Sequence, residues 1–148
     1  MSLDPTTILQ PLIEMGANDL THNNNKTLLR HLLNTAMILA AEKQPDHVVL
    51  AGLYHSVYGT EFYGCDFLSM HNSDHRNYLS EKIGKDAERL VFLYCSLDRK
   101  EFMRYYGQPK KPIRFLQDDQ FLEVTPEEEV DLMSLFSANE AEHLIANV

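Results

Sequence analysis

An apolar run from Val48 to Val57 is the feature that most constrains how this chain can fold. The run is long enough for a helix and has almost no polar face, so other elements must cover it on all sides. The segment before it, from Leu29 to about Lys43, places apolar residues at three- and four-residue spacing and predicts an amphipathic helix. We therefore expect a helical domain that is built around this pair of helices.

The remaining sequence predicts further helices and one small hairpin. Thr125 and Glu128 form a capping box, with Pro126 at the first position of a long terminal helix. Two short apolar segments flank a polar turn and predict paired strands; they cover residues 113–116 and 121–124. Other helices are expected at 5–16, from 73 or 74 to about 82, around 87–94 and from 98 to 107. The predicted fold class is all-α, with about six or seven helices and a small β-hairpin near 113–124.

The terminal helix is expected to bury an apolar face against the rest of the domain. Methionines are expected to fill gaps in the same core, because their side chains are flexible; they are Met37, Met103 and Met133. The residues assigned to the buried face of the helix are Val130, Met133, Leu135, Phe136, Ala138, Ala141, Leu144 and Ile145.

Length and composition limit the classes of protein to which the chain can belong. A chain of 148 residues that is 44% apolar is expected to form one domain over 1–148, in which residues 1–3 could be a cloning remnant. A net charge of −9 repels a nucleic-acid backbone and offers no basic patch to an anionic membrane. With two cysteines and no secretory leader, the sequence predicts a cytoplasmic protein with reduced thiols.

Two of the seven histidines fall where a metal ion could be held. His31 lies within the amphipathic helix and His55 ends the apolar helix, so two rigid elements could direct two imidazoles at one ion. Imidazole suits zinc, iron, nickel or manganese. The alternative for His31 is a partly buried histidine that bonds the backbone or Asn139.

Two segments resemble the HD superfamily of metal-dependent phosphohydrolases. They are HNNNKTLLRHLL (22–33) and AGLYHSVYGTEF (51–62), and they are most similar to an uncharacterised subfamily with that pattern. The resemblance implies an all-helical fold with one His on a first helix, a His-Asp pair that ends another, and a final Asp on a late helix. This chain departs from the pattern, because Ser56 follows His55 and Asn139 occupies the late position.

The resulting site hypothesis combines metal ligands, a base and polar contacts. His31 and His55, joined by His22, are the predicted metal ligands, and Glu61 is the predicted general base or orienting residue. Glu140 or Glu142 could partly replace the missing carboxylates. The residues predicted to bind a ligand are Ser56, Tyr58, Thr60 and Asn139.

Three functions remain open at this point. The first is a pocket between the helices of His31 and His55 that binds a small metabolite, phosphorylated or not. Hydrolysis is expected there only if a divalent transition metal is retained, and the site could also hold none. The second is a non-catalytic descendant that senses a ligand or binds a protein. The third is a purely structural interaction module. A small-molecule ligand and a second copy of the chain are the expected partners.

Overall fold

The computed structural model describes residues 4–18, 21–22, 26–59, 67–115 and 119–146, and within them the chain is mostly helical. Seven helices are assigned: α1 (Pro5–Glu14), α2 (Leu28–Ala41), α3 (Asp46–Tyr54), α4 (Ser73–Ile83), α5 (Lys85–Ser96), α6 (Arg99–Arg104) and α7 (Pro126–Ala146). Two small antiparallel hairpins accompany them, formed by β1 (Thr21–His22) with β2 (Lys26–Thr27) and by β3 (Lys110–Pro112) with β4 (Phe121–Glu123). The predicted all-α class with a small hairpin is confirmed.

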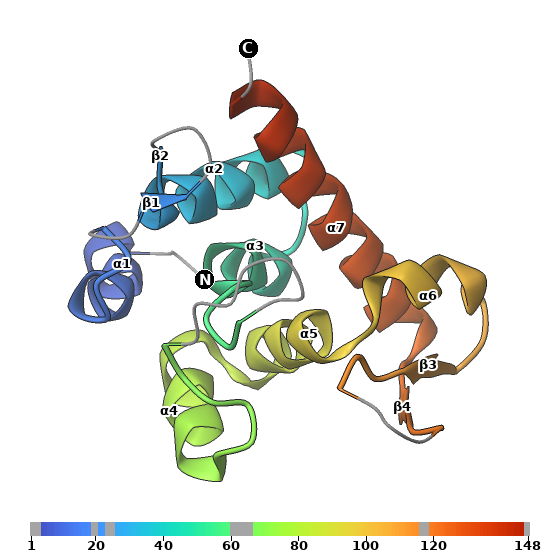
Figure 1. Ribbon diagram of the computed structural model, residues 1–148. Helices are drawn as coiled ribbons and strands as arrows, with labels where there is room; N and C mark the ends of the chain where they lie inside the picture. The colour runs from blue at the N-terminus through green and yellow to red at the C-terminus, as the bar shows by residue number, and fades with distance from the viewer. Residues whose placement is uncertain (1–3, 19–20, 23–25, 60–66, 116–118, 147–148) are drawn as a thin grey trace.

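Helix α3 lies at the centre of the fold, with α2, α5 and α7 packed around it (Figure 1). Val48, Ala51 and Tyr54 are fully buried on it, as the apolar run requires. Helix α2 crosses α3 at close range at Gly52, which has no side chain to separate the two helices. The long α7 packs against α2, α3 and α5, so it meets helices that lie far from it in the sequence.

Side-chain caps fix where the functional helices begin. The Thr27 hydroxyl accepts from Arg30 N at 3.1 Å and starts α2. At the start of α7, Thr125 N donates to Glu128 Oε1 at 3.0 Å and Glu128 N donates to Thr125 Oγ1 at 3.1 Å. This reciprocal pair confirms the predicted capping box. Helix α2 carries His31 of the candidate site, and α7 carries Asn139 and Glu142. The caps fix where these two helices begin.

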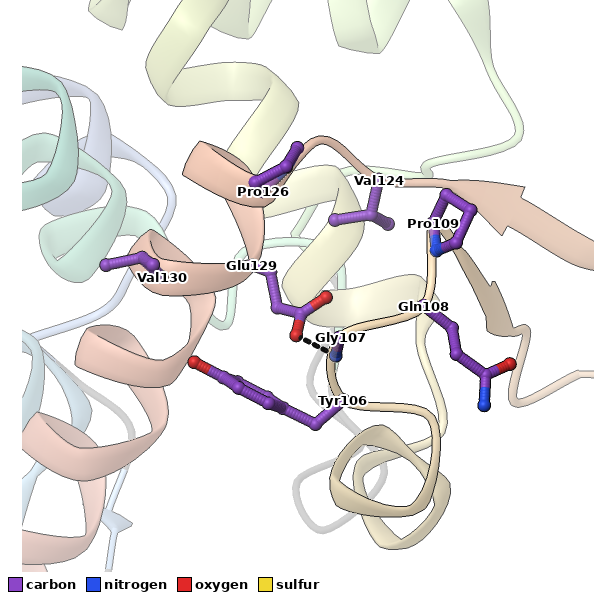
Figure 2. Close-up of a pocket in the computed structure, with 8 residues that line it drawn as sticks. All are labelled: Tyr106, Gly107, Gln108, Pro109, Val124, Pro126, Glu129 and Val130. Carbon is purple, nitrogen blue, oxygen red and sulfur yellow. Dashed lines mark hydrogen bonds between the residues drawn. The ribbon is translucent and has the colours of Figure 1, made fainter.

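A buried ion pair shifts the first strand of the second hairpin from its predicted place. The strand lies at 110–112 instead of 113–116, and Ile113 forms an isolated bridge with Leu97. Lys111 is the fully buried middle residue of β3, and its Nζ is 2.8 Å from Glu129 Oε2 on α7. Glu129 Oε1 also accepts from Gly107 N at 2.5 Å (Figure 2). A strand whose inward residue is a lysine lacks the apolar alternation by which strands are predicted from sequence.

The prediction that α7 buries all of its apolar residues is wrong. Val130, Leu144 and Ile145 are 57%, 70% and 64% exposed. Met103, on α6, is also 61% exposed, and Met37 is likewise exposed. The reason is geometric, because the neighbouring helices cover the Leu132, Leu135 and Asn139 side of α7 and leave its opposite side open. In the described part of the chain no helix is both long enough and apolar enough to cross a membrane.

Replacing Gly52 with alanine is expected to destabilise the fold by about 1 to 3 kcal/mol, the usual cost of overpacking a core. A Cβ at this position would lie 2.4 Å from Leu39 Cδ1, so the buried leucine must move. Urea unfolding of Gly52→Ala, Leu39→Ala and the double variant measures the coupling between the two positions. The double variant should lose less stability than the sum of the two single losses. Strict additivity would contradict the close packing of α2 on α3.

Candidate functional site

The structure brings His31 and His55 together at the meeting point of α2, α3 and α7. His31 lies in α2, and His55 directly follows the last residue of α3. Asn139 and Glu142 extend to the same place from α7. All four residues are buried. Four polar residues from three helices therefore form one cluster inside the core, where each needs a polar partner.

The two ring nitrogens of His31 contact different partners. Its Nδ1 is 2.5 Å from Glu142 Oε1. Its Nε2 is 3.3 Å from His55 Nε2 and 3.0 Å from Asn139 Oδ1. The Thr35 hydroxyl donates to the His31 backbone carbonyl at 2.9 Å, within the same helix. The His31 ring thus lies between the Glu142 carboxylate on its Nδ1 side and two acceptor atoms, His55 Nε2 and Asn139 Oδ1, on its Nε2 side.

Backbone contacts determine the tautomer of His55. Its Nδ1 is 2.6 Å from the Gly52 carbonyl, which can only accept, so Nδ1 carries the proton. Burial, together with the nearby charge of His31, lowers the pKa of the His55 imidazole to about 3. The ring is therefore neutral at physiological pH. Its Nε2 presents an acceptor lone pair toward His31 and Asn139.

His31 Nε2, His55 Nε2 and Asn139 Oδ1 are candidate ligand atoms, and the two separations measured from His31 Nε2 suit ligands around a single cation. Atoms that bind one ion at about 2.1 Å lie roughly 3.0 Å apart at a right angle and roughly 3.4 Å apart in a tetrahedron. The observed separations at His31 Nε2 are 3.3 Å to His55 Nε2 and 3.0 Å to Asn139 Oδ1. Two imidazole nitrogens and an amide oxygen therefore fit a divalent transition metal.

Contacts behind the two rings also fit a metal site. A metal-binding histidine usually donates its other N–H to a carboxylate or a backbone carbonyl. Here Glu142 stands behind His31 and the Gly52 carbonyl stands behind His55. The second oxygen of Glu142 accepts from Asn34 Nδ2 at 3.1 Å, so the carboxylate is itself held in place. The Glu142 carboxylate therefore lies next to the three candidate ligand atoms but is not itself one of them.

A second group of ligand-type side chains overlaps the first but suits a cation less well. His31, Glu142 and His143 offer ligand atoms within 4.8 Å of one another. The 2.5 Å between His31 Nδ1 and Glu142 Oε1 is a hydrogen-bond distance and is too short for two ligands of one ion. The rings of His31 and His143 stack with their centroids 4.7 Å apart. We therefore favour the grouping of His31, His55 and Asn139.

Ser56 and Tyr58 follow His55 but have different surroundings. Ser56 Oγ is buried and has no hydrogen-bond partner among the described residues. The Tyr58 hydroxyl donates to Glu88 Oε2 at 2.8 Å, and burial raises the pKa of this phenol. Arg76 binds the same carboxylate through two nitrogens, at 2.9 and 2.8 Å. Tyr58 therefore belongs to a partly buried ion-pair cluster, whereas Ser56 retains an unused polar atom.

Some predicted site residues fall where the structure gives no description. Thr60 and Glu61 lie outside the described residues, so the predicted base stays a prediction. His22 belongs to β1, but its side chain lies outside the described part of the chain. Of the two candidate acids on α7, Glu142 is in the cluster, while Glu140 is largely exposed and pairs with Arg99 at 3.4 Å.

Sequence reasoning did not identify the residues that position the two histidines. Asn34 and Gly52 were not singled out, and Glu142 was only one of two candidate acids. A helical spacing of three residues was the available indication, because it places Glu142 on the same face as Asn139, and Asn34 on the same face as His31. The same spacing places Gly52 three residues before His55, within reach of its ring nitrogen.

Comparison with known proteins identifies a family. Residues 11–99 match the sequence model of a family described as a domain of unknown function, DUF6817. This range includes His31 and His55 but ends before α7, which supplies Asn139 and Glu142. No curated protein and no solved structure matches the chain.

Proposed function

The chain belongs to the DUF6817 family, and we propose that it is a metal-dependent hydrolase of small phosphorylated metabolites, with His31, His55 and Asn139 as the metal ligands. The observation that carries the proposal is the arrangement of the two imidazoles. Each Nδ1 is held by an acceptor, and the two Nε2 atoms face each other 3.3 Å apart. Such a pair is suited to share one cation.

The chemistry of the donor set favours transition metals over harder ions. Two neutral nitrogens and one neutral oxygen offer no direct charge to Mg²⁺ or Ca²⁺, which prefer several oxygen ligands. Zinc, iron(II), nickel and manganese accept imidazole, and the carboxylate of Glu142 lies directly behind His31. A divalent cation at this position would supply Lewis acidity and would make a water molecule more acidic.

Each nearby residue has a distinct role in the proposed hydrolysis. Glu142 orients His31 and helps to balance positive charge in the core. Ser56 Oγ, buried and without a described partner, could donate to an oxygen of the substrate. Arg99 Nη2 donates to the Tyr94 hydroxyl at 2.6 Å, and the Tyr94 ring packs against His55 with the ring centroids 5.1 Å apart, so Arg99 places a positive charge near the cluster. This local positive charge favours an anionic substrate such as a phosphate ester.

The resemblance to HD phosphohydrolases supports the same substrate class. The proposal is tested by elemental analysis of the purified protein together with a screen of nucleotides and sugar phosphates. We expect about one equivalent of a transition metal and phosphate release that is lost in a His31→Ala, His55→Ala double variant. Phosphate release that is unchanged in the double variant would end the enzymatic proposal.

A non-catalytic role is the second candidate, and the burial of the cluster favours it. His31 can donate from Nδ1 to Glu142 and from Nε2 to Asn139, so the hydrogen bonds of its ring can be complete without a cation. Such a cluster would specify the packing of α2 against α7. The thermal unfolding of the metal-free protein distinguishes the two cases, because a resident cation stabilises the folded state by mass action. A midpoint that does not respond to zinc favours the structural role.

Replacing Glu142 with glutamine is expected to weaken zinc binding by about 10- to 100-fold, the usual cost of losing the residue behind a metal-binding histidine. Glutamine keeps the volume and can accept from Asn34, but it removes the charge behind His31. Isothermal titration with zinc measures the change. Glu140→Gln is the matched control, because this residue is exposed on the same helix and should leave affinity unchanged. Equal affinities in the two variants would contradict the role assigned to Glu142.

A further inference from the structure

The candidate metal cluster is buried, but a surface cavity lies close to it. The cavity is between α6 and α7 and has a volume of about 430 Å³, a size that is usual for pockets that hold small organic molecules. Phe136, which lines it, contacts the Tyr94 ring at a centroid distance of 4.9 Å, and Tyr94 meets His55 edge-on at 5.1 Å. A layer of aromatic rings therefore connects the cavity with His55.

The lining of the cavity combines an apolar wall with one cation. Arg99 Nη2 donates to the Tyr94 hydroxyl at 2.6 Å, so the guanidinium lies toward the cluster. Its Cζ atom is 4.9 Å from the centre of the Phe136 ring. Such a lining suits a molecule with an apolar body and an anionic end. The apolar residues of the wall are Phe102, Met103, Met133, Phe136, Ala141 and Leu144.

Arg99 already has an acidic partner at the cavity, but the pair is weak. Arg99 Nη1 is 3.4 Å from Glu140 Oε1, and the Glu140 side chain is 64% exposed, so the pair contributes little to stability. A phosphate group carries more negative charge than a carboxylate and can bind arginine through two oxygens at once. It can therefore replace Glu140, which turns to solvent, while Arg99 keeps its hydrogen bond to Tyr94.

We propose that this cavity binds phosphate monoesters of apolar alcohols, with the phosphate on Arg99 and the alcohol carbons against the apolar wall. The inference rests on the proposed function, because these esters are the substrate class that it assigns to the metal-dependent hydrolase. Tyr94 contacts both Arg99 and His55, so its side chain must move aside for the phosphate to reach the cluster. Hydrolysis breaks the bond between phosphorus and the alcohol oxygen, and water supplies a hydroxyl to phosphorus and a proton to the alcohol.

Titration of the metal-free protein with hexylphosphonate tests the cavity separately from catalysis, because its C–P bond is not an ester bond. Met103→Asp should weaken binding at least about 10-fold, since it places an acid beside the anionic ligand. Met37→Asp is the matched control and should bind like the wild type, because Met37 is 65% exposed on α2, as Met103 is 61% exposed on α6, but does not line the cavity. Arg99→Gln removes the cation and should also weaken binding at least about 10-fold.

Hydrolysis of hexyl phosphate and of glycerol phosphate separates the two proposals, because both esters release a primary alcohol but only hexanol is apolar. We expect kcat/KM for hexyl phosphate to be at least about 10-fold higher, since the wall buries only the apolar alcohol. Equal or faster hydrolysis of glycerol phosphate would overturn the cavity assignment and leave the hydrolase. Hexylphosphonate binding that is absent from the wild type, or equal in Met103→Asp and Met37→Asp, would overturn the cavity assignment too. Binding that needs Met103 and Arg99, in a protein that holds no metal and releases no phosphate, would uphold the cavity and contradict the hydrolase.

Discussion

Replacing His55 with alanine is expected to lower the affinity for zinc by more than about 100-fold. Loss of a residue that only supports a metal-binding histidine usually costs about 10- to 100-fold, and loss of a ligand itself should cost more. The substitution removes one of two imidazoles whose Nε2 atoms lie 3.3 Å apart, and it leaves His31 and Asn139 as the remaining donors. Titration of the metal-free protein with zinc measures the affinity directly. Magnesium and calcium should not compete, because the donor set has no carboxylate.

Two controls keep this result interpretable. His71→Ala removes an exposed histidine that lies away from the cluster, and it should bind zinc like the wild type. Thermal unfolding without metal shows whether His55→Ala still folds, and zinc should then stabilise the wild type but not this variant. If His55→Ala and His71→Ala bind zinc equally well, the assignment of the metal to the buried cluster is wrong.

Replacing Lys111 with methionine is expected to destabilise the protein by about 3 to 5 kcal/mol, the cost of leaving a buried charge without its partner. The carboxylate of Glu129 would lose the ammonium at 2.8 Å and keep only the Gly107 amide. Lys111 Nζ also donates to the Tyr105 carbonyl and lies 5.4 Å from the centre of the Phe102 ring, so the hairpin, α6 and α7 all depend on it. Urea unfolding measures the loss.

A second substitution separates charge from packing at this position. Lys111→Met combined with Glu129→Gln has no buried charge, and glutamine can still accept from Gly107. This double variant should recover most of the lost stability. Arg104→Met breaks an exposed pair with Glu101 and should cost less than about 1 kcal/mol. A double variant as unstable as Lys111→Met would show that packing, and not the ion pair, stabilises this region.

The fold was largely predictable because helical periodicity is a local property. The apolar run became the central helix α3, and Thr125 with Glu128 marked the start of α7 correctly. The errors came from tertiary partners. Lys111 forms part of a strand because Glu129 lies opposite it, and no local pattern contains that information. The exposed residues Val130, Leu144 and Ile145 of α7 were predicted to be core because periodicity identifies an apolar face but not what covers it.

The candidate site was predictable only in part. The spacing of His31 and His55, with the helices that carry them, indicated two imidazoles in one place, and the structure puts their Nε2 atoms 3.3 Å apart. Asn139 was expected at the site, and it lies 3.0 Å from His31. The pairing of Glu142 with His31 spans more than one hundred residues, so only the packing of α2 on α7 reveals which of the two candidate acids is inside.

The location of a bound metal tests the central claim most directly. Crystals grown with zinc, with diffraction recorded on both sides of the zinc absorption edge, would show where the ion lies. We expect one anomalous peak within about 2.1 Å of His31 Nε2 and His55 Nε2, with Asn139 Oδ1 as a third ligand. A peak at the His31 Nδ1 side, between Glu142 and His143, or no peak in the cluster, would contradict the proposed metal site.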